Sequence, residues 1–286
     1  MRIDLHTHSN RSDGTETPAV VVETAAAAGL DVIGLTDHDV TSGWAEADRV
    51  GQQLGVSVVP GIEVSCSHRG ISVHMLGYLF DPTSADLVAD LTRSRESRVG
   101  RIRKMAELLQ ADGYPVSYQA VLDHARDEAT LGRPHLADAL VTAGVVEHRN
   151  AAFESLLARD GGYYVSHYAP TPRDMVRLIE AAGGVTVLAH PFAQTRGEVV
   201  GDEVIEELAE AGLTGIEVDH RDHSPAARTR AADLAARLGL LPTGSSDYHG
   251  DTGKPNRLGE NTTSPEVLTA LLERASGHPM LGAPLG

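Results

Sequence analysis

Short apolar runs alternate along the chain with longer segments in which apolar residues recur at every third or fourth position. The short runs predict buried strands, and the periodic segments predict amphipathic helices. Strands are expected at Arg2–Leu5, Val32–Thr36, Val56–Val59, Ile71–His74, Gly184–Ala189 and Gly215–Val218, with a last one in the run that begins at Leu240. Strands that alternate with helices through short links are typical of right-handed β-α-β units on a parallel sheet.

Helix start and stop signals lie between these runs. Thr17 and Pro18 provide a cap and a first helical residue, and Gly29 ends that helix. Ser42 is expected to cap a second helix that stops before Gly55. Further helices are expected at 171–182, 202–211, 224–238 and 264–274, and the Gly- and Pro-rich stretch 277–286 is expected to be a loosely held tail.

The alternation is interrupted from about Ser84, where strand signals almost disappear. Helical segments are expected at 86–109, 117–128, 134–142 and 150–159, with Gly and Pro clusters between them. We predict an inserted helical subdomain at 92–168 between two barrel segments, 1–91 and 169–286. Because the insertion leaves and rejoins the barrel between strands that carry candidate site residues, we expect it to cover the active site.

The first strand ends in a pair of histidines. His6 and His8 point to the same face if the strand alternates regularly, and Asp13 follows after a polar loop that Gly14 can turn. Two imidazoles and a carboxylate at one strand end are typical metal ligands. The alternative is a solvated loop that happens to hold two histidines.

Four later segments share this design, with a metal-binding type of side chain at or near the end of an apolar run. The carboxyl ends of the strands in a parallel α/β barrel lie together and form the usual functional face, so these residues can converge. We predict these metal ligands: His6, His8, Asp13, His38, Glu63, His74, His190, Asp247 and His249. The aspartates Asp4, Asp37 and Asp39 are expected to orient the histidines or to cap loops.

Composition narrows the class of protein. The chain has 286 residues and a formal net charge of −16, which argues against a protein that coats duplex nucleic acid. Cys66 is the only cysteine, so an intramolecular disulfide and a thiolate-rich zinc site are excluded. No apolar run approaches the ~20 residues that span a bilayer, and the N-terminus lacks a secretion signal. We therefore expect a cytoplasmic enzyme without a membrane partner.

The candidate ligands indicate hydrolysis of a phosphate ester. Histidines and carboxylates without thiolates suit Zn²⁺, Mn²⁺ or Fe²⁺ in a catalytic site. Two or three such ions can generate a hydroxide and neutralise both the attacking and the leaving oxygen of a phosphoryl transfer. Neither a GxxxxGK[ST] loop nor a GxSxG elbow is present, which weakens nucleotide triphosphatase and serine hydrolase assignments.

Several short motifs together resemble the PHP (polymerase and histidinol phosphatase) family: His6-Thr-His8, Asp13-Gly14, Thr36-Asp-His-Asp39, Gly61-Ile-Glu63, His74, Ala189-His-Pro191 and Ser246-Asp-Tyr-His249. The resemblance covers residue 1 to about 250 and implies a distorted (β/α)₇ TIM-like barrel with a trinuclear site. It assigns one ion to His6, His8, Glu63 and Asp247, a second to Glu63, His74 and His190, and a third to Asp13, His38 and His249. Up to three divalent ions are implied, with Mn²⁺ favoured and Fe²⁺, Zn²⁺ or Mg²⁺ as alternatives.

Within that family, the helical insertion and the motif Leu131–His135 resemble a stand-alone bacterial branch that acts on nucleotides. That branch contains 3′,5′-nucleoside bisphosphate phosphatases, which act on pAp-like compounds, and 5′→3′ exoribonucleases. A small nucleotide or a short single-stranded RNA is then the expected substrate. Arg133 is the candidate phosphate clamp and His135 a second contact, unless the motif only starts a helix with a surface arginine. His223 is a further candidate substrate contact.

The resemblance leads to a mechanistic hypothesis. A hydroxide held between ions attacks phosphorus in line, Glu63 bridges two of the ions, and Arg133 balances charge on the phosphoryl oxygens. The proton for the leaving alkoxide is assigned to His38, to His190 or to a water on a metal ion. Two alternatives are a histidinol phosphate phosphatase and a non-catalytic metal-binding scaffold domain. The remaining histidines, His220 among them, are expected on the surface or in structural roles.

Overall fold

The computed structural model describes residues 1–125, 130–252 and 254–285. Contacts divide the chain into two compact units, one of Met1–Asp90 with Ala169–Gly286 and one of Leu91–Tyr168. The sequence predicted an inserted subdomain at 92–168. Its role as a cover over the active site stays a prediction. Among the described helices, none combines the length and the apolar character needed to cross a membrane.

The first unit is built on one curved sheet whose strands follow one another in sequence order: β1 (Ile3–Thr7), β2 (Val32–Leu35), β3 (Ser57–His68), β4 (Ile71–Tyr78), β5 (Val185–Ala189), β6 (Gly215–Asp219) and β7 (Leu241–Gly244). A parallel bridge between Thr7 and Tyr248 joins β1 to the segment that follows β7. The sheet is thus a nearly closed barrel, and the predicted TIM-like α/β fold is confirmed.

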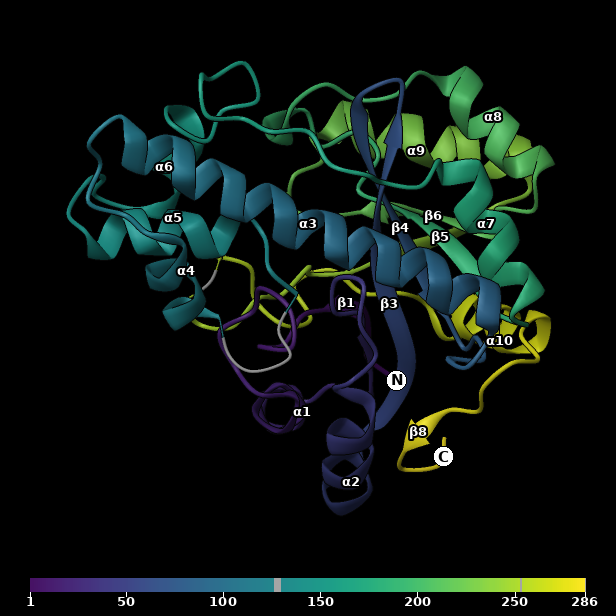
Figure 1. Ribbon diagram of the computed structural model, residues 1–286. Helices are drawn as coiled ribbons and strands as arrows, with labels where there is room; N and C mark the ends of the chain where they lie inside the picture. The colour runs from purple at the N-terminus through teal and green to yellow at the C-terminus, as the bar shows by residue number, and fades with distance from the viewer. Residues whose placement is uncertain (126–129, 253, 286) are drawn as a thin grey trace. The chain divides into compact units, whose positions relative to one another are not determined.

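Helices flank this sheet in Figure 1: α1 (Pro18–Ala27), α2 (Trp44–Leu54), α7 (Pro172–Ala181), α8 (Asp202–Glu210), α9 (Pro225–Leu238) and α10 (Pro265–Arg274). Four of them, α1, α7, α9 and α10, begin with a Ser or Thr cap followed by proline, as the Thr17-Pro18 pair predicted. Helix α2 differs, because its cap is Gly43 and not the predicted Ser42.

The barrel departs from strict parallel order at β4. Strands β3 and β4 form a long antiparallel hairpin, and Arg69 and Gly70 turn it with positive φ angles of 48° and 89°. Strand β4 also pairs antiparallel with β5. As a result Glu63 and His74 lie within paired strands and not at strand ends.

The C-terminal segment is held by the barrel. Strand β8 (Leu281–Gly282) pairs antiparallel with β3, with Leu281 opposite Val58, and the Ala283 amide donates to the Val56 carbonyl. The prediction of a loosely held tail at 277–286 is therefore wrong. A two-residue strand has too little hydrophobic pattern to be found from sequence.

The second unit is helical and has its own core. It contains most of α3 (Ala85–Ala111), with α4 (Tyr118–His124), α5 (Arg133–Thr142) and α6 (Arg149–Glu154). Ile102, Met105 and Leu109 of α3 share a buried cluster with Leu136 and Leu140 of α5. Figure 1 shows α4, α5 and α6 beside the C-terminal part of α3. The predicted end of α4 at Glu128 lies outside the described residues.

Candidate metal centre

The predicted ligands of the first unit converge at one end of the barrel. His6 is in β1, Glu63 in β3 and His74 in β4, and the others lie in the segments that follow strands β1, β2, β5 and β7. These residues form three overlapping groups whose ligand atoms lie within 4.8 Å of one another: His6, His8, Glu63 and Asp247; His38, Glu63 and His74; and His8, Asp13, His38 and His249.

Glu63 is at the centre of this cluster and is 1% exposed. Its Oε1 lies 2.7 Å from His74 Nδ1 and 3.2 Å from His190 Nε2. Its Oε2 lies 3.2 Å from His6 Nε2 and 3.0 Å from His8 Nε2. The two oxygens of one carboxylate therefore face two different sets of imidazoles, which is the arrangement that a bridging ligand requires.

Hydrogen bonds at Nδ1, the ring nitrogen opposite the one that faces the cluster, fix the orientation of several histidines. His6 Nδ1 lies 3.0 Å from the Glu217 carboxylate, His38 Nδ1 lies 3.3 Å from the Glu63 carbonyl, and His249 Nδ1 lies 2.8 Å from the Asp247 carbonyl. Each acceptor holds the proton on Nδ1 and leaves the lone pair of Nε2 directed into the cluster. Such outer hydrogen bonds are typical of histidines that bind metals.

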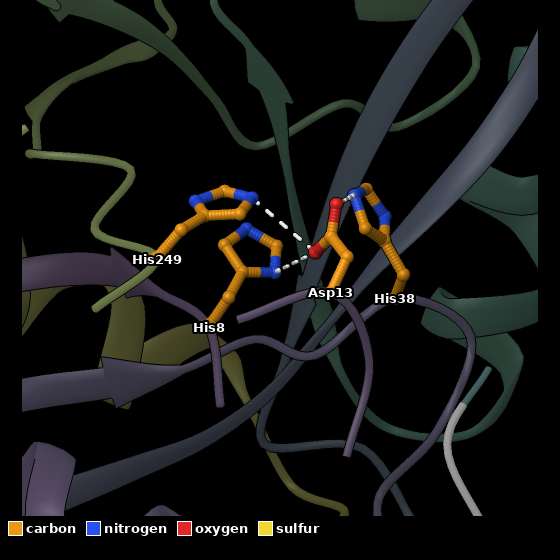
Figure 2. A group of neighbouring side chains, drawn as sticks. All are labelled: His8, Asp13, His38 and His249. Carbon is orange, nitrogen blue, oxygen red and sulfur yellow. Dashed lines mark ion pairs between the residues drawn. The ribbon is translucent and has the colours of Figure 1, made fainter. Parts of the chain in front are cut away.

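Asp13 gathers a second group of imidazoles, as Figure 2 shows. Its Oδ1 lies 3.3 Å from His249 Nε2 and 3.9 Å from His8 Nδ1, and its Oδ2 lies 3.9 Å from His38 Nε2. His8 thus faces Asp13 with one ring nitrogen and Glu63 with the other.

The chemistry of these side chains fits divalent cations. Among the described residues, buried ligand atoms without a hydrogen-bond partner include Asp13 Oδ1, His249 Nε2, Asp247 Oδ1 and His8 Nδ1. Buried lone pairs without a donor are costly unless a cation satisfies them. The set consists of imidazoles and carboxylates, the donors preferred by Mn²⁺, Fe²⁺ and Zn²⁺.

Burial and neighbouring ionisable groups shift the pKa values of the side chains in the cluster. Burial opposes ionisation of Glu63, but the neighbouring imidazoles His38, His6 and His74 hold its pKa well below the usual range. Burial also opposes protonation of His8, yet hydrogen bonds to Asp247 and Glu63 raise its pKa to about 9. Burial lowers the pKa of His38 to about 3. A protonated histidine such as His8 thus supplies part of the positive charge that balances the buried carboxylates.

The loops around the cluster are held in unusual conformations. His190 and Asp247 have positive φ angles of 28° and 54°. Asp37 accepts hydrogen bonds from the Ser9 amide, the Ser9 hydroxyl and the Ser12 hydroxyl, which orders the loop between His8 and Asp13. Non-glycine residues with φ above zero are strained and are often found in functional sites.

Sequence reasoning missed Glu217, which lies in β6 and is fully buried. Its carboxylate accepts from the backbone N–H of His190 at 2.7 Å and from the Ser245 hydroxyl, in addition to His6. The available signal was an acidic residue in the middle of the short apolar run Gly215–Val218. His220, expected on the surface or in a structural role, is also fully buried, with its ring centroid 5.1 Å from that of His190.

Two cations near the cluster were also missed. Arg196 Nη2 lies 2.5 Å and Lys254 Nζ 3.2 Å from Asp247 Oδ2, while Asp247 Oδ1 faces His6 and His8. Arg196 ends a short 3₁₀ helix and Lys254 lies in a loop. Neither belongs to a recognisable motif, so the sequence offered no signal for them.

The predicted substrate contacts are placed as follows. Both ring nitrogens of His223 have backbone partners, since Nε2 accepts from the Phe192 amide at 3.2 Å and Nδ1 lies 2.9 Å from the Val218 carbonyl. Arg133 and His135 belong to the second unit, where His135 Nδ1 accepts from the Gly132 amide. The contact of these three residues with substrate stays a prediction.

Comparison with known proteins relates the chain to one domain family and to enzymes that act on phosphate esters. The model of the PHP domain family matches residues 4–150. A 3′,5′-nucleoside bisphosphate phosphatase from Chromobacterium violaceum is 36% identical over 247 residues, which cover 86% of this chain and 87% of that protein. A phosphoribosyl 1,2-cyclic phosphate 1,2-diphosphodiesterase from Eggerthella lenta is 37% identical over 267 residues, or 90% of this chain and 97% of that protein.

A 5′-3′ exoribonuclease from Haemophilus influenzae is 30% identical over 87% of this chain and 90% of that protein. The crystal structure of a protein described as a metal-dependent phosphoesterase from Bifidobacterium adolescentis superposes with a TM-score of 0.92 at 38% identity and covers 96% of each chain.

Proposed function

The chain belongs to the PHP domain family of metal-dependent phosphoesterases, and we propose that it hydrolyses phosphate esters of nucleotides at the cluster centred on Glu63. It is a hydrolase, as its relatives are. The observation that carries the proposal is the division of the Glu63 carboxylate between two sets of imidazoles, each of which turns a ring nitrogen toward it. A carboxylate between two sets of nitrogen ligands suits a site with more than one ion.

The proposed ligand sets follow the three groups in the cluster. One ion would take His6, His8, Glu63 and Asp247, a second Glu63, His74 and His190, and a third Asp13, His38 and His249. Bound divalent ions supply an activated water and positive charge for the phosphoryl oxygens. Mn²⁺ is the proposed metal, because histidine and carboxylate ligands without thiolates suit it.

Residues around the cluster orient the histidines so that their ring nitrogens can bind metal. Glu217 and the carbonyls of Glu63 and Asp247 hold His6, His38 and His249 in one tautomer. Burial lowers the pKa of His38, and burial and the charge of Arg196 lower that of His190. Both rings are therefore neutral near pH 7, which suits a ligand better than a proton donor for the leaving alkoxide.

The proposed substrates are the 3′-phosphate of nucleoside 3′,5′-bisphosphates such as pAp, or short 5′-phosphorylated oligoribonucleotides. The Chromobacterium and Haemophilus relatives support this class by their names. A second candidate is a cyclic phosphodiester of a phosphorylated sugar, which the relative from Eggerthella favours at similar identity. All three substrates carry a second phosphate group or a phosphodiester, so each brings several negative charges to the site.

A comparison of substrates tests the proposal. The protein, loaded with Mn²⁺, is given pAp, a short 5′-phosphorylated RNA, a ribose 1,2-cyclic phosphate carrying a 5-phosphate, and histidinol phosphate, and kcat/KM is measured for each. We expect pAp or the RNA to be preferred by at least tenfold. A preference for the cyclic compound would select the second candidate, and a preference for histidinol phosphate would contradict a nucleotide substrate.

A further inference from the structure

The two oxygens of the Asp247 carboxylate have different surroundings. Oδ1 lies 3.4 Å from His6 Nε2 and 3.2 Å from His8 Nε2. Oδ2 lies 2.5 Å from Arg196 Nη2 and 3.2 Å from Lys254 Nζ. Because Asp247 is 1% exposed, solvent has almost no access to either oxygen. One oxygen therefore faces the metal cluster, and the other is held by two cations.

Oδ1 of Asp247 fits the ligand set of a single ion. His6 Nε2, His8 Nε2 and Glu63 Oε2 lie 3.0–3.2 Å from one another, and Oδ1 lies 3.2–3.4 Å from the two imidazole nitrogens. Ligand atoms bound about 2.1 Å from one ion are separated by about 3.0–3.4 Å in octahedral or tetrahedral geometry. Within the described ranges, Oδ1 is buried without a hydrogen-bond partner, which suits an oxygen that binds metal.

The cations at Oδ2 are themselves held in place. Arg196 Nε lies 2.6 Å from Asp222 Oδ2, so a second carboxylate orients the guanidinium. Lys254 belongs to the segment between β7 and α10 that also contains Asp247. Both cations and both carboxylates belong to the first unit, so the arrangement lies within one compact body. An ion that bound Oδ2 would have to displace at least one of these cations.

A third nitrogen donor lies near the same oxygen. His220 Nε2 is 3.8 Å from Asp247 Oδ2, and in the part of the chain that the structure describes it is buried without a hydrogen-bond partner. The Asp222 amide donates to His220 Nδ1 at 3.1 Å, so the ring proton is on Nε2. N–H groups from three separate segments thus surround Oδ2, and none of the three lies within 4 Å of a metal-binding position on the Oδ1 side by any listed contact other than through Asp247 itself.

We propose that Arg196 and Lys254 are positioning residues that restrict Asp247 to one metal-binding oxygen. The restriction keeps a coordination position free for substrate at the ion assigned to His6 and His8. This inference rests on the proposed function, because it concerns a ligand set assigned there. That set supplies four protein atoms when Asp247 binds through Oδ1 alone. Mn²⁺ favours an octahedral set of ligands, and catalytic metal sites differ from structural ones by their open positions.

The positioning role predicts opposite effects on metal affinity and turnover. Positive charges beside a ligand carboxylate oppose the binding of a cation, so their removal should strengthen metal binding. Removal also frees Oδ2 to bind the ion, which takes a position from the substrate and lowers kcat. If the two cations only supported the fold of the site, their loss would weaken metal binding and turnover together.

The test is titration of the chelated full-length protein with Mn²⁺, followed by the relaxation of water protons at saturation. This relaxation depends on the number of water molecules that exchange on each bound Mn²⁺. Arg196→Met and Lys254→Met are expected to bind Mn²⁺ at least as tightly as the wild type and to relax water protons less per bound ion. Each should also lose about tenfold or more in kcat with pAp, as is typical when an outer partner is removed.

Two further variants complete the series. Arg237→Met removes an arginine that pairs with Glu206 between α8 and α9, far from the ligands in sequence, and should match the wild type in affinity, relaxation and kcat. Arg196→Lys keeps the charge with a single donor group, so it should recover part of the relaxation and of kcat. It also tests the role of Arg196 if Arg196→Met does not fold.

The proposal is overturned by either of two results. One is relaxation per bound ion in Lys254→Met and the Arg196 variants that equals that of the wild type. The other is weaker Mn²⁺ binding by about tenfold or more in these variants, which would make the cations structural supports of the site.

Relaxation does not depend on the substrate, which separates this inference from the proposed function. A wild type that binds Mn²⁺ but does not hydrolyse pAp would contradict the proposed substrate, while lower relaxation in the variants would still support the positioning role. A wild type that hydrolyses pAp, together with variants of unchanged relaxation, would contradict the positioning role alone.

Discussion

At the scale of single residues, the site depends on side chains that orient the ligands as much as on the ligands. Glu217 is the clearest example, because its carboxylate accepts the Nδ1 proton of His6 and the backbone N–H of His190. It thereby fixes one ligand from β1 and another that follows β5. Outer partners of this kind raise the basicity of a histidine ligand and hold its lone pair in place.

Glu217→Gln should weaken metal binding about 10- to 100-fold, as loss of an outer partner typically does. The amide has one acceptor oxygen, whereas the carboxylate accepts from His6, His190 and Ser245, so an NH₂ group must face a donor. Titration of the chelated protein with Mn²⁺ measures the effect. Glu207→Gln, on the exposed face of α8, is the matched control, and equal affinities of the two variants would contradict this role.

The ligands themselves could be predicted from sequence, whereas their supports could not. His6, His38, His190 and His249 follow or end short apolar runs, a local signal that sequence preserves. Glu217 and Arg196 act through contacts with residues more than 25 positions away, which no local pattern records. Their roles became visible only when the strands were brought side by side.

At the scale of secondary structure, the barrel depends on a close approach of β1 and β2. A Cβ at Gly34 would collide with the backbone of Leu5, including its carbonyl oxygen. The Thr7 hydroxyl also donates to the Gly34 carbonyl at 2.8 Å. Glycine at this point allows the two strands to pair tightly beneath His6 and His8.

Gly34→Ala should lower the free energy of unfolding by about 1–3 kcal/mol, since the strands must separate to admit a methyl group. Gly100→Ala is the control, because its Cβ would meet nothing within 4 Å and alanine favours the helix α3. Urea unfolding of both variants makes the comparison. A Gly34→Ala variant as stable as Gly100→Ala would show that this approach of the strands is not tight.

Secondary structure was predictable where caps and periodicity coincide. Thr17, Thr171, Ser224 and Ser264 each precede a proline and each caps the helix that was expected there. The hairpin of β3 and β4 is not predictable from the sequence, because Ser65, Ser67 and His68 interrupt the apolar pattern. Pairing of the two strands along their whole length is a tertiary effect.

At the scale of the whole chain, the candidate metal centre joins distant parts of the first unit. Ligands from β1, β3 and β4 meet ligands from the segments after β2, β5 and β7. Ions bound there would link strands separated by most of the sequence. Ligand binding to the folded state alone stabilises it, by about 2.7 kcal/mol at a concentration 100 times Kd.

Removal of metal should therefore lower the melting temperature. A chelated sample is expected to melt several degrees below one saturated with Mn²⁺, since about 1 kcal/mol shifts the midpoint of a domain of this size by roughly 2–4 °C. Differential scanning calorimetry of the two samples gives the shift. Identical melting curves would mean that the ligand cluster holds no ion of appreciable affinity.

The most direct measurement of the central claim combines ion binding with turnover. Chelated protein is titrated with Mn²⁺ while bound metal and the rate of phosphate release from pAp are recorded, for the wild type, Glu63→Gln and the control Glu207→Gln. We predict that activity rises in parallel with bound metal in the wild type and the control, and that Glu63→Gln loses at least a hundredfold in rate. Hydrolysis that survives chelation, or wild-type turnover in Glu63→Gln with metal bound, would contradict the assignment of the Glu63 cluster as the active site.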